Sequence, residues 1–421
     1  MTPVFKKDDA SLASNYRPIS ILSAIPKILE KVMFDQLYNA FRPVFSPNMS
    51  GFLKGHSCCT ALVKMIDDWR LALDSKKVTG SIAIDLSKAF DSICHNLLLA
   101  KLSAYGVREG ATKFLHSYLS ERRQRVKVNG IYSDWLPVYC GVPQGSLLGP
   151  LLFNIFINDL NFVVQVSSLR LYADDTTTYA SDTNTSALEL SLNNDLHKLL
   201  SWFSSNYLSV NHDKTQAMII GNSSQDPVLH IGDSTIEITN HLKILGVHID
   251  NGLTFNEHVS AVLKKVYARI GALRRLKKLV PPDIALLLYK AYILPHLEYC
   301  GPLLIGINKT LAKKLESANY YALKTLVNAG NSLDYNTVLS QANMESLENR
   351  RYFQSLILLF NCIKNNGPSY ISNLFEHRPL RYNLRNGGCN LVQPSYNNRF
   401  YHNSFTYKLS NLWNKLPCSP D

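Results

Sequence analysis

Acidic residues are few relative to basic ones in this chain: 32 Asp and Glu stand against 44 Lys and Arg among 421 residues, a formal net charge of +12. A surplus of positive charge favours a polyanionic partner, nucleic acid above all. Hydrophobic residues make up 46% of the sequence, enough for a sizeable core, so extensive disorder is excluded. The length predicts roughly two to three domains.

Paired cysteine motifs and long apolar runs are also absent from the sequence. The eight cysteines form no CxxC pair and no zinc-knuckle spacing, which excludes the common zinc modules. The start, "MTPVFKKDDA", lacks the apolar core of a signal peptide. The most apolar stretch, "IALLLYKAYILPHLEYCGPLLIG", is interrupted by Lys290, Pro295 and Glu298, so it is a poor membrane span. We therefore expect a soluble intracellular protein whose cysteines are reduced and pack as ordinary residues.

The spacing of the apolar residues alternates irregularly between helical and strand periods, which indicates an α+β domain followed by a helical one. Helices are expected over 15–45, 57–74, 95–120, 186–205 and 256–280, with further helices over 281–375. The apolar stripe of the first expected helix consists of Ile25, Ile28, Leu29, Val32, Met33 and Leu37. The dipeptide Asn129-Gly130 lies between two alternating runs, which is the strongest short-range signal for a β-hairpin.

Two aspartates, Asp174 and Asp175, follow a strand-like run in "LRLYADDTTTYA", residues 169–180. Successive side chains of a strand point to opposite faces, so a straight strand would bury one carboxylate at a cost of several kcal/mol. A hairpin whose two-residue loop is Asp174-Asp175 avoids this cost and projects both carboxylates from its tip. Asp85 ends another apolar run, "SIAID". Neighbouring strands would bring the three carboxylates to one rim.

Three like charges at one rim repel each other unless cations are present. Oxygen ligands without nearby His or Cys favour Mg²⁺ or Mn²⁺ over zinc. Two such ions stabilise the attacking and the leaving oxygen in phosphoryl transfer. The residues alone thus favour a divalent metal site at a strand tip, while an isolated Asp-Asp pair is also explained by a solvated turn.

Four segments occur in order along the chain: "AIDLSKAFDSICHNLLLAKLSAYGV", "GVPQGSLLGPLLFNIFINDL", "LYADDTTTYA" and "LSVNHDKTQAMII". Together they resemble the reverse transcriptases of non-LTR retrotransposons, the jockey-like LINE group, over residues 15 to about 260. The resemblance implies an α+β right-hand polymerase. Its parts would be partial, N-terminally truncated fingers at 1–80 and a palm at 81–255, which would hold the antiparallel sheet, the catalytic carboxylates and inserted fingers and hairpin elements. A helical thumb with C-terminal helices at 256–375 and an irregular tail at 376–421 would follow.

The implied activity is RNA-directed DNA synthesis. The implied partners are an RNA template, a DNA primer and deoxynucleoside triphosphates, and the implied cofactor is a pair of Mg²⁺ ions, with Mn²⁺ as the substitute. Such a protein would work as a ribonucleoprotein in the nucleus or the cytoplasm.

The resemblance also implies roles for the acidic residues. Asp85, Asp174 and Asp175 would be the catalytic carboxylates, and the carbonyl of Leu86 would complete their metal site. Lys214 matches a family lysine that is proposed to protonate the departing pyrophosphate, a role that general acids fill with roughly 10²–10⁴-fold effects.

The residues implied to bind the nucleotide are Phe90, Gln144, Gly145, Arg17 and Lys54. Phe90 lies where the family places a bulky ring beneath the sugar, and a 2′-hydroxyl would clash with that ring. Gln144 would form a hydrogen bond near the nascent base pair, and Asp91 would brace the turn. The family often has Arg directly after "GF", whereas this chain has Leu53 and then Lys54. A lysine lacks the bidentate grip of a guanidinium on phosphate.

The residues implied to contact primer or template are Ser146, Leu245, Gly246, Lys264, Lys265, Arg269, Arg274, Arg275, Lys277 and Lys278. Most of them belong to one helix, "VLKKVYARIGALRRLKKL", which has seven Lys or Arg between 264 and 278 and no acid. A solvated helix face usually mixes charge signs, so the one-sided charge favours contact with nucleic-acid phosphates. The apolar side of this helix is expected to consist of Val262, Val266, Ile270, Leu273 and Leu276.

Relatives of this kind normally carry an endonuclease ahead of the polymerase, and the fingers here begin almost at Met1, so we expect a partial reading frame. Two alternatives therefore stay open. One is a catalytically weak or inactive remnant that binds nucleic acid, and the other is a group II intron-like maturase, which shares the palm. Primer extension separates synthesis from binding alone.

Overall fold

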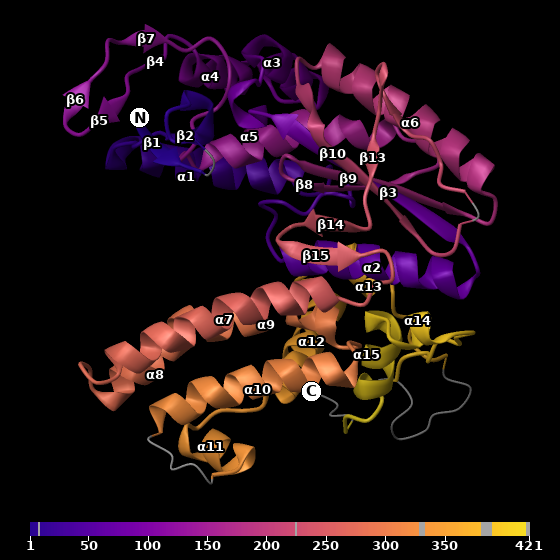
Figure 1. Ribbon diagram of the computed structural model, residues 1–421. Coiled ribbons are helices and arrows are strands. Elements are labelled where there is room, and N and C mark those ends of the chain that lie inside the picture. Colours follow the sequence, from indigo (N-terminus) through magenta and orange to yellow (C-terminus); the bar gives the residue numbers. More distant parts are fainter. Residues whose placement is uncertain (7–8, 224, 328–332, 380–389, 418–421) are drawn as a thin grey trace.

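The computed structural model of the chain describes residues 1–6, 9–223, 225–327, 333–379 and 390–417, and its centre is a five-stranded sheet (Figure 1). The strands follow the order β13 (Glu237–Ile238), β10 (Ser209–Ile220), β3 (Val78–Ser87), β9 (Asp175–Asp182) and β8 (Ser168–Tyr172). The pairs β10–β3, β3–β9 and β9–β8 are antiparallel, whereas β10 and β13 pair in parallel at the edge. The expected antiparallel sheet is present, with one parallel edge pair that the sequence did not predict.

Helices cover both faces of this sheet (Figure 1). Helix α6 (Thr185–Ser205) lies on one face, where Gly80 of β3 permits close approach: a Cβ at this position would lie 2.5 Å from Leu192 Cδ1. Helix α2 (Cys58–Asp74) lies on the other face and packs the buried Trp69 edge-on against Tyr179 of β9. The strands are therefore buried from both sides, and polar site residues can reach solvent only at the strand ends.

Four further helices pack beside the sheet: α1 (Ala24–Phe41), α3 (His95–Ala104), α4 (Glu109–Leu119) and α5 (Leu148–Ile157). The predicted apolar stripe of α1 is wrong for most of its members, since Ile25 is 80% exposed and Ile28 68% exposed. The helix is rotated so that Met33, Tyr38 and Phe41 are buried, because these larger side chains pack toward α5 and its neighbours. The predicted helix over 95–120 is divided into α3 and α4.

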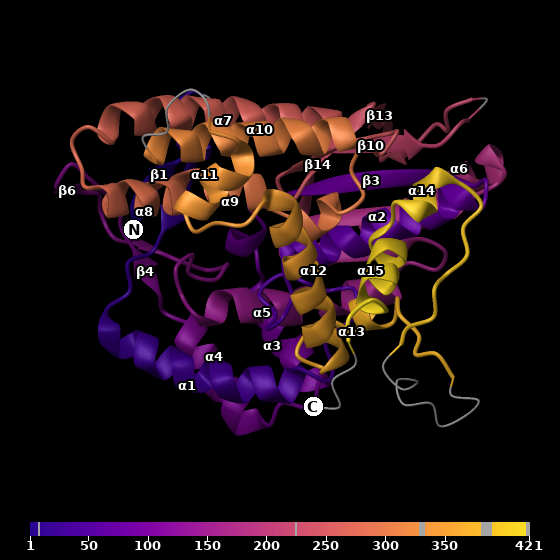
Figure 2. The ribbon, with the colours of Figure 1, turned by 90° about the horizontal axis from the view of Figure 1, so that it is seen from below.

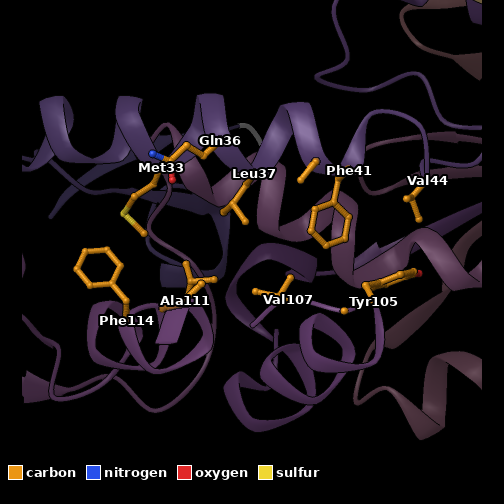
Figure 3. A pocket seen from close by; sticks show the side chains of 12 residues that line it. Met33, Gln36, Leu37, Phe41, Val44, Tyr105, Val107, Ala111 and Phe114 are labelled. Atoms are coloured by element: carbon orange, nitrogen blue, oxygen red, sulfur yellow. The ribbon is translucent and has the colours of Figure 1, made fainter. Parts of the chain in front are cut away.

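An apolar cavity of about 310 Å³ lies between α1 on one side and α4, with the segment that joins it to α3, on the other (Figure 3). Met33, Leu37 and Phe41 line it from α1, and Val107 and Phe114 face them from the other side. No residue that the sequence assigned to a functional site lines this cavity.

Short antiparallel ribbons surround the sheet. They are β1 (Thr2–Phe5) with β2 (Tyr16–Ile19), β4 (Arg123–Gln124) with β7 (Leu136–Pro137), β5 (Lys127–Val128) with β6 (Ile131–Tyr132), β11 (His230–Ile231) with β12 (Ser234–Thr235), and β14 (His241–Ile244) with β15 (Val247–Asp250). The turn between β5 and β6 is Asn129-Gly130, and both residues have positive φ angles, 49° and 86°. The predicted hairpin is therefore confirmed.

The C-terminal half is helical. Its helices are α7 (Asn256–Leu276), α8 (Pro282–Tyr292), α9 (Leu294–Glu298), α10 (Lys309–Leu326), α11 (Tyr335–Gln341), α12 (Leu347–Ile363), α13 (Ser369–Ser372), α14 (Arg399–His402) and α15 (Phe405–Trp413). Helices α7 and α10 lie side by side around a separate core (Figure 2). The prediction of an irregular tail is wrong for α14 and α15, which dock on α2, where the buried Asp67 accepts hydrogen bonds from the backbone of Phe405 and Thr406.

Among the helices that the structure describes, none combines the length and the hydropathy needed to cross a bilayer. The cysteines in the described residues are free thiols: Cys58, Cys59, Cys94, Cys140, Cys300 and Cys362. Cys389 and Cys418 lie outside the described residues.

Candidate active site

Three carboxylates lie at the ends of neighbouring strands in the middle of the sheet. The register of β3 and β9 pairs Ile84 with Thr176, so Asp85 and Asp175 follow on adjacent strands. Asp174 occupies the turn from β8 into β9. The sequence therefore predicted correctly that residues 85 and 174 come together across neighbouring β-elements.

The turn itself differs from the prediction by one residue. Tyr172 pairs with Asp175, so the two-residue loop is Ala173-Asp174 rather than Asp174-Asp175. Ala173 adopts the left-handed conformation, with φ of 55°. The segment before α2 supports this backbone, since Gly51 approaches so closely that a Cβ would lie 2.3 Å from the Ala173 nitrogen. Asp175 thus begins a strand, and Asp174 alone projects from the loop.

The electrostatics of these carboxylates show mutual repulsion. Burial, followed by the charges of Asp174 and Asp85, raises the pKa of Asp175 to about 6. The pKa of Asp174 is also raised, mainly by burial and further by the charge of Asp85. The positive charges of the nearby Arg17 and Lys6 oppose this rise. A cation among the three carboxylates would remove the repulsion.

The donor set suits a hard divalent cation because all its atoms are oxygens. The carboxylate side chains do not converge on a single point, however. Within the described residues, no group of three or more His, Cys, Asp and Glu side chains has the geometry to hold a metal ion. The carboxylates share one rim as separate groups, and Leu86, whose backbone carbonyl was predicted as a further ligand, pairs with Val210 of β10.

These carboxylates line a large cleft of about 1750 Å³. Of the residues predicted from the sequence, the cleft is also lined by Arg17, Leu86, Phe90, Gln144, Gly145, Ser146 and Lys214. Lys214 reaches it from a bulge of β10 between Asn211 and Gln216, and its Nζ lies 3.9 Å from Asp85 Oδ2. Arg17 reaches it from β2. Segments far apart in the sequence therefore meet at one surface that has both acidic and basic groups.

Phe90 has a fixed position on the wall of the cleft. It belongs to a short 3-10 turn, Ala89–Asp91, that follows β3 directly. Its ring stacks on Phe153 of α5 with centroids 4.5 Å apart, and the Phe52 ring meets it edge-on at 6.3 Å. Two aromatic partners leave this ring little freedom to move.

Asp91 holds the loop that contains Gln144. Gln144 Nε2 donates to both carboxylate oxygens of Asp91, at 2.9 and 3.0 Å, and the Gln144 carbonyl accepts from the backbone N–H of Ser20. Gly145 follows with φ of 119°, and a Cβ there would lie 2.6 Å from the Ser20 oxygen. The bracing role predicted for Asp91 is therefore present. Ser146 accepts a hydrogen bond from the backbone of Gly149 and supports the start of α5.

Glu30 supports the same loop, and the sequence reasoning missed it. It is only 1% exposed, its Oε2 accepts from the Leu147 backbone N–H at 2.8 Å, and its Oε1 accepts from the Tyr118 hydroxyl at 2.6 Å. The available signal was its spacing, since Glu30 precedes the buried Met33 by three residues on the same helix. A charge on the buried face of a helix needs partners, and here they include the backbone of the loop that contains Gln144.

Several predicted residues lie elsewhere. Lys54 is not among the residues that line the cleft, and its ammonium lies 5.2 Å from the centre of the Tyr38 ring. Leu245 and Gly246 form the turn between β14 and β15, where the Leu245 carbonyl accepts from the Tyr299 hydroxyl at 2.6 Å.

The basic residues of α7 also lie outside the cleft lining. The helix itself carries Lys264, Lys265, Arg269, Arg274 and Arg275, and Lys277 and Lys278 follow its end at Leu276. Arg269 and Lys277 are half-buried, and the other five are exposed. The Lys277 ammonium donates to the Thr325 carbonyl of α10. The opposite side buries Val266, Ile270 and Leu273 as predicted, but Leu276 is 44% exposed. The helix thus presents positive charge on one side and attaches to the helical core by the other.

Residues 4–249, more than half of the chain, match the sequence model of a family described as reverse transcriptase (RNA-dependent DNA polymerase). The chain belongs to the reverse transcriptase family, and its fold is the α+β right hand that the motifs predicted. Curated relatives confirm the resemblance to jockey-like elements. The chain is 30% identical over 278 residues to the probable RNA-directed DNA polymerase from transposon BS of Drosophila melanogaster, covering 62% of this chain and 30% of that protein.

It is also 27% identical over 298 residues to the RNA-directed DNA polymerase from mobile element jockey of Drosophila funebris, covering 68% of this chain and 32% of that protein. The chain thus spans about a third of the length of these relatives. Among solved structures it is similar to apo telomerase from Candida Tropicalis, with a TM-score of 0.44 and 14% identity over 82% of this chain and 55% of that one.

Proposed function

We propose that this chain is the polymerase unit of a non-LTR retrotransposon and extends a DNA primer on an RNA template. The observation that carries the proposal is the arrangement around Asp85 and Asp174. These carboxylates lie on neighbouring strands, in one cleft with Phe90 and the Gln144 loop. In the reaction, the primer 3′-hydroxyl attacks the α-phosphate of a deoxynucleoside triphosphate, and pyrophosphate leaves.

Asp85, Asp174 and Asp175, with the Leu86 carbonyl, would hold two divalent cations, Mg²⁺ in preference to Mn²⁺. When bound, such cations stabilise the charge on the attacking and leaving oxygens of a phosphoryl transfer. The raised pKa values of Asp174 and Asp175 support this assignment, because they arise in part from a repulsion that a cation relieves.

The remaining groups would bind the nucleotide and donate a proton to the departing pyrophosphate. The Phe90 ring, held by Phe153, would lie beneath the sugar and exclude a 2′-hydroxyl. Arg17 would attract the triphosphate, since its charge already acts on Asp174. Lys214, whose ammonium lies 3.9 Å from an Asp85 oxygen, would be the acid that protonates the departing pyrophosphate. The exposed basic side of α7 would follow the phosphates of the template–primer duplex.

Primer extension on poly(rA)/oligo(dT) with Mg²⁺ tests the proposal. Asp174→Ala should lower the rate by roughly 10³-fold or more, because the variant loses metal stabilisation of the transition state. Asp233→Ala is the matched control, since Asp233 is an exposed aspartate in the turn between β11 and β12. The Asp174 variant should still bind the template–primer. Near-normal extension by this variant would refute the site.

A second candidate function is nucleic-acid binding without synthesis. The position of Lys54 favours it, because the expected fingers cation lies on Tyr38 instead of in the cleft. In that case the wild-type chain would bind the template–primer and fail to extend it with either deoxy- or ribonucleotides.

A further inference from the structure

None of the site residues discussed above belongs to the hairpin at residues 122–139. It runs through β4, β5, β6 and β7, and backbone hydrogen bonds from Ser133 to Val126 and from Val138 to Arg122 hold its two arms together. It projects at the edge of the molecule, where β5 packs beside β1 (Figure 1).

This hairpin exposes large apolar and aromatic side chains. Tyr139 is 82% exposed, Trp135 51% and Tyr132 48%, and Ile131 is exposed by 76%. Packing within the protein does not account for rings that lie so open to water. A cluster of exposed rings of this kind marks an interaction surface.

Basic side chains are interleaved with these rings. The Arg125 guanidinium lies 4.0 Å from the centre of the Tyr132 ring and 4.7 Å from that of Trp135, and Lys127 Nζ lies 5.2 Å from the Tyr132 ring. Residues 122–139 include four Lys or Arg and one Asp. Among the described residues, no carboxylate forms an ion pair with Arg123, Arg125 or Lys127. The ring faces are thus held in place beside cations that remain available to phosphates.

The inner side of the hairpin is continuous with the catalytic cleft. Gln124, Val128 and Tyr139 line the same cleft as Asp85 and Asp174. A nucleic-acid strand that lies along this wall of the cleft would therefore contact both the region of the carboxylates and the hairpin.

We infer that this hairpin is a stacking platform for the unpaired template strand as it enters the cleft. Aromatic rings beside basic groups bind single strands by stacking on free base faces while the cations neutralise the backbone. Paired bases stack on one another and offer no free faces except at the duplex end, so the platform fits an unpaired strand. This inference rests on the proposed polymerase function, because that function makes the strand at this wall a template.

Equilibrium binding tests the platform without any need for catalysis. The full chain is titrated, at one fixed salt concentration, into a fluorescent template–primer with about ten unpaired template nucleotides, and into the same duplex with blunt ends. Trp135→Ala combined with Tyr139→Ala should weaken binding to the overhang duplex roughly tenfold or more and leave the blunt duplex unchanged. Trp135→Phe keeps a ring and should retain most of the affinity. Phe162→Ala is the control, because Phe162 is 80% exposed and does not line the cleft.

An equal loss on both duplexes, or no loss on either, would overturn the inference, and the latter result would point to a protein partner for the exposed rings. The binding assay also separates this inference from the proposed function. If the wild-type chain fails to extend a primer while the overhang-selective loss persists, only the polymerase proposal fails. If extension is normal and the double variant binds both duplexes as the wild type does, only the platform fails.

Discussion

Removal of the buried Glu30 carboxylate should weaken both the fold and nucleotide binding. Glu30→Ala eliminates the two hydrogen bonds that the buried carboxylate accepts from the Leu147 N–H and the Tyr118 hydroxyl. Hydrogen bonds to charged groups contribute about 1.5–3 kcal/mol each, and two bonds to one carboxylate add less than fully, so we expect a loss of about 3 kcal/mol. A domain with a stability of about 5–15 kcal/mol would remain folded. Glu30→Gln keeps an acceptor and should lose about 1 kcal/mol.

Asp35→Ala is the matched control on the same helix. Asp35 is 46% exposed and pairs with Lys31 one turn away, a surface ion pair that contributes about 0.3–0.5 kcal/mol. Urea denaturation gives the stability of each variant. Steady-state kinetics should show a severalfold rise in the KM for deoxynucleotide only for the Glu30 variants, because Leu147 is in the loop that carries Gln144. If Glu30→Ala loses no more stability than Asp35→Ala, the role of the buried carboxylate is wrong. If its stability falls but its KM is unchanged, Glu30 does not influence nucleotide binding through the loop that carries Gln144.

Three further predictions concern other parts of the molecule. Asp67 accepts hydrogen bonds from the Phe405 N–H and from the N–H and hydroxyl of Thr406. Asp67→Ala should therefore lower the free energy of unfolding by about 3–5 kcal/mol in urea denaturation. A loss under about 1 kcal/mol would contradict this role. Gly145→Ala should abolish most extension activity while the duplex still binds, because the left-handed backbone and the Ser20 oxygen leave no room for a methyl group; normal activity would show that the loop can shift. Burial, followed by the charges of His248 and Lys265, lowers the pKa of His258 to about 4, so between pH 6.5 and 4 the unfolded chain binds more protons at this residue than the folded one. The stability of the wild type relative to His258→Gln should therefore fall by about 3 kcal/mol over this interval as the pH decreases, and a pH-independent difference would contradict the buried neutral state.

The sequence determined the elements that local patterns control. Asp85 and Asp174 end runs of apolar residues, and the two-fold alternation of strands predicted that these carboxylates reach solvent only at strand tips. The Asn129-Gly130 turn was equally readable, because positive φ angles at both positions favour these residues in a two-residue hairpin. The apolar side of α7 was correct at Val266, Ile270 and Leu273 for the same reason.

Tertiary structure decided which of several apolar faces was buried and which partner each polar group received. In α1, the predicted apolar stripe was mostly left exposed, and packing against α5 instead buried the side with Glu30, Met33 and Phe41. The same packing gave Glu30 its loop partner more than a hundred residues away along the chain. The spacing of apolar residues contains no information about such distant neighbours. The alternation of side chains along a strand, in contrast, is a local property of the backbone, so it can be predicted from the sequence.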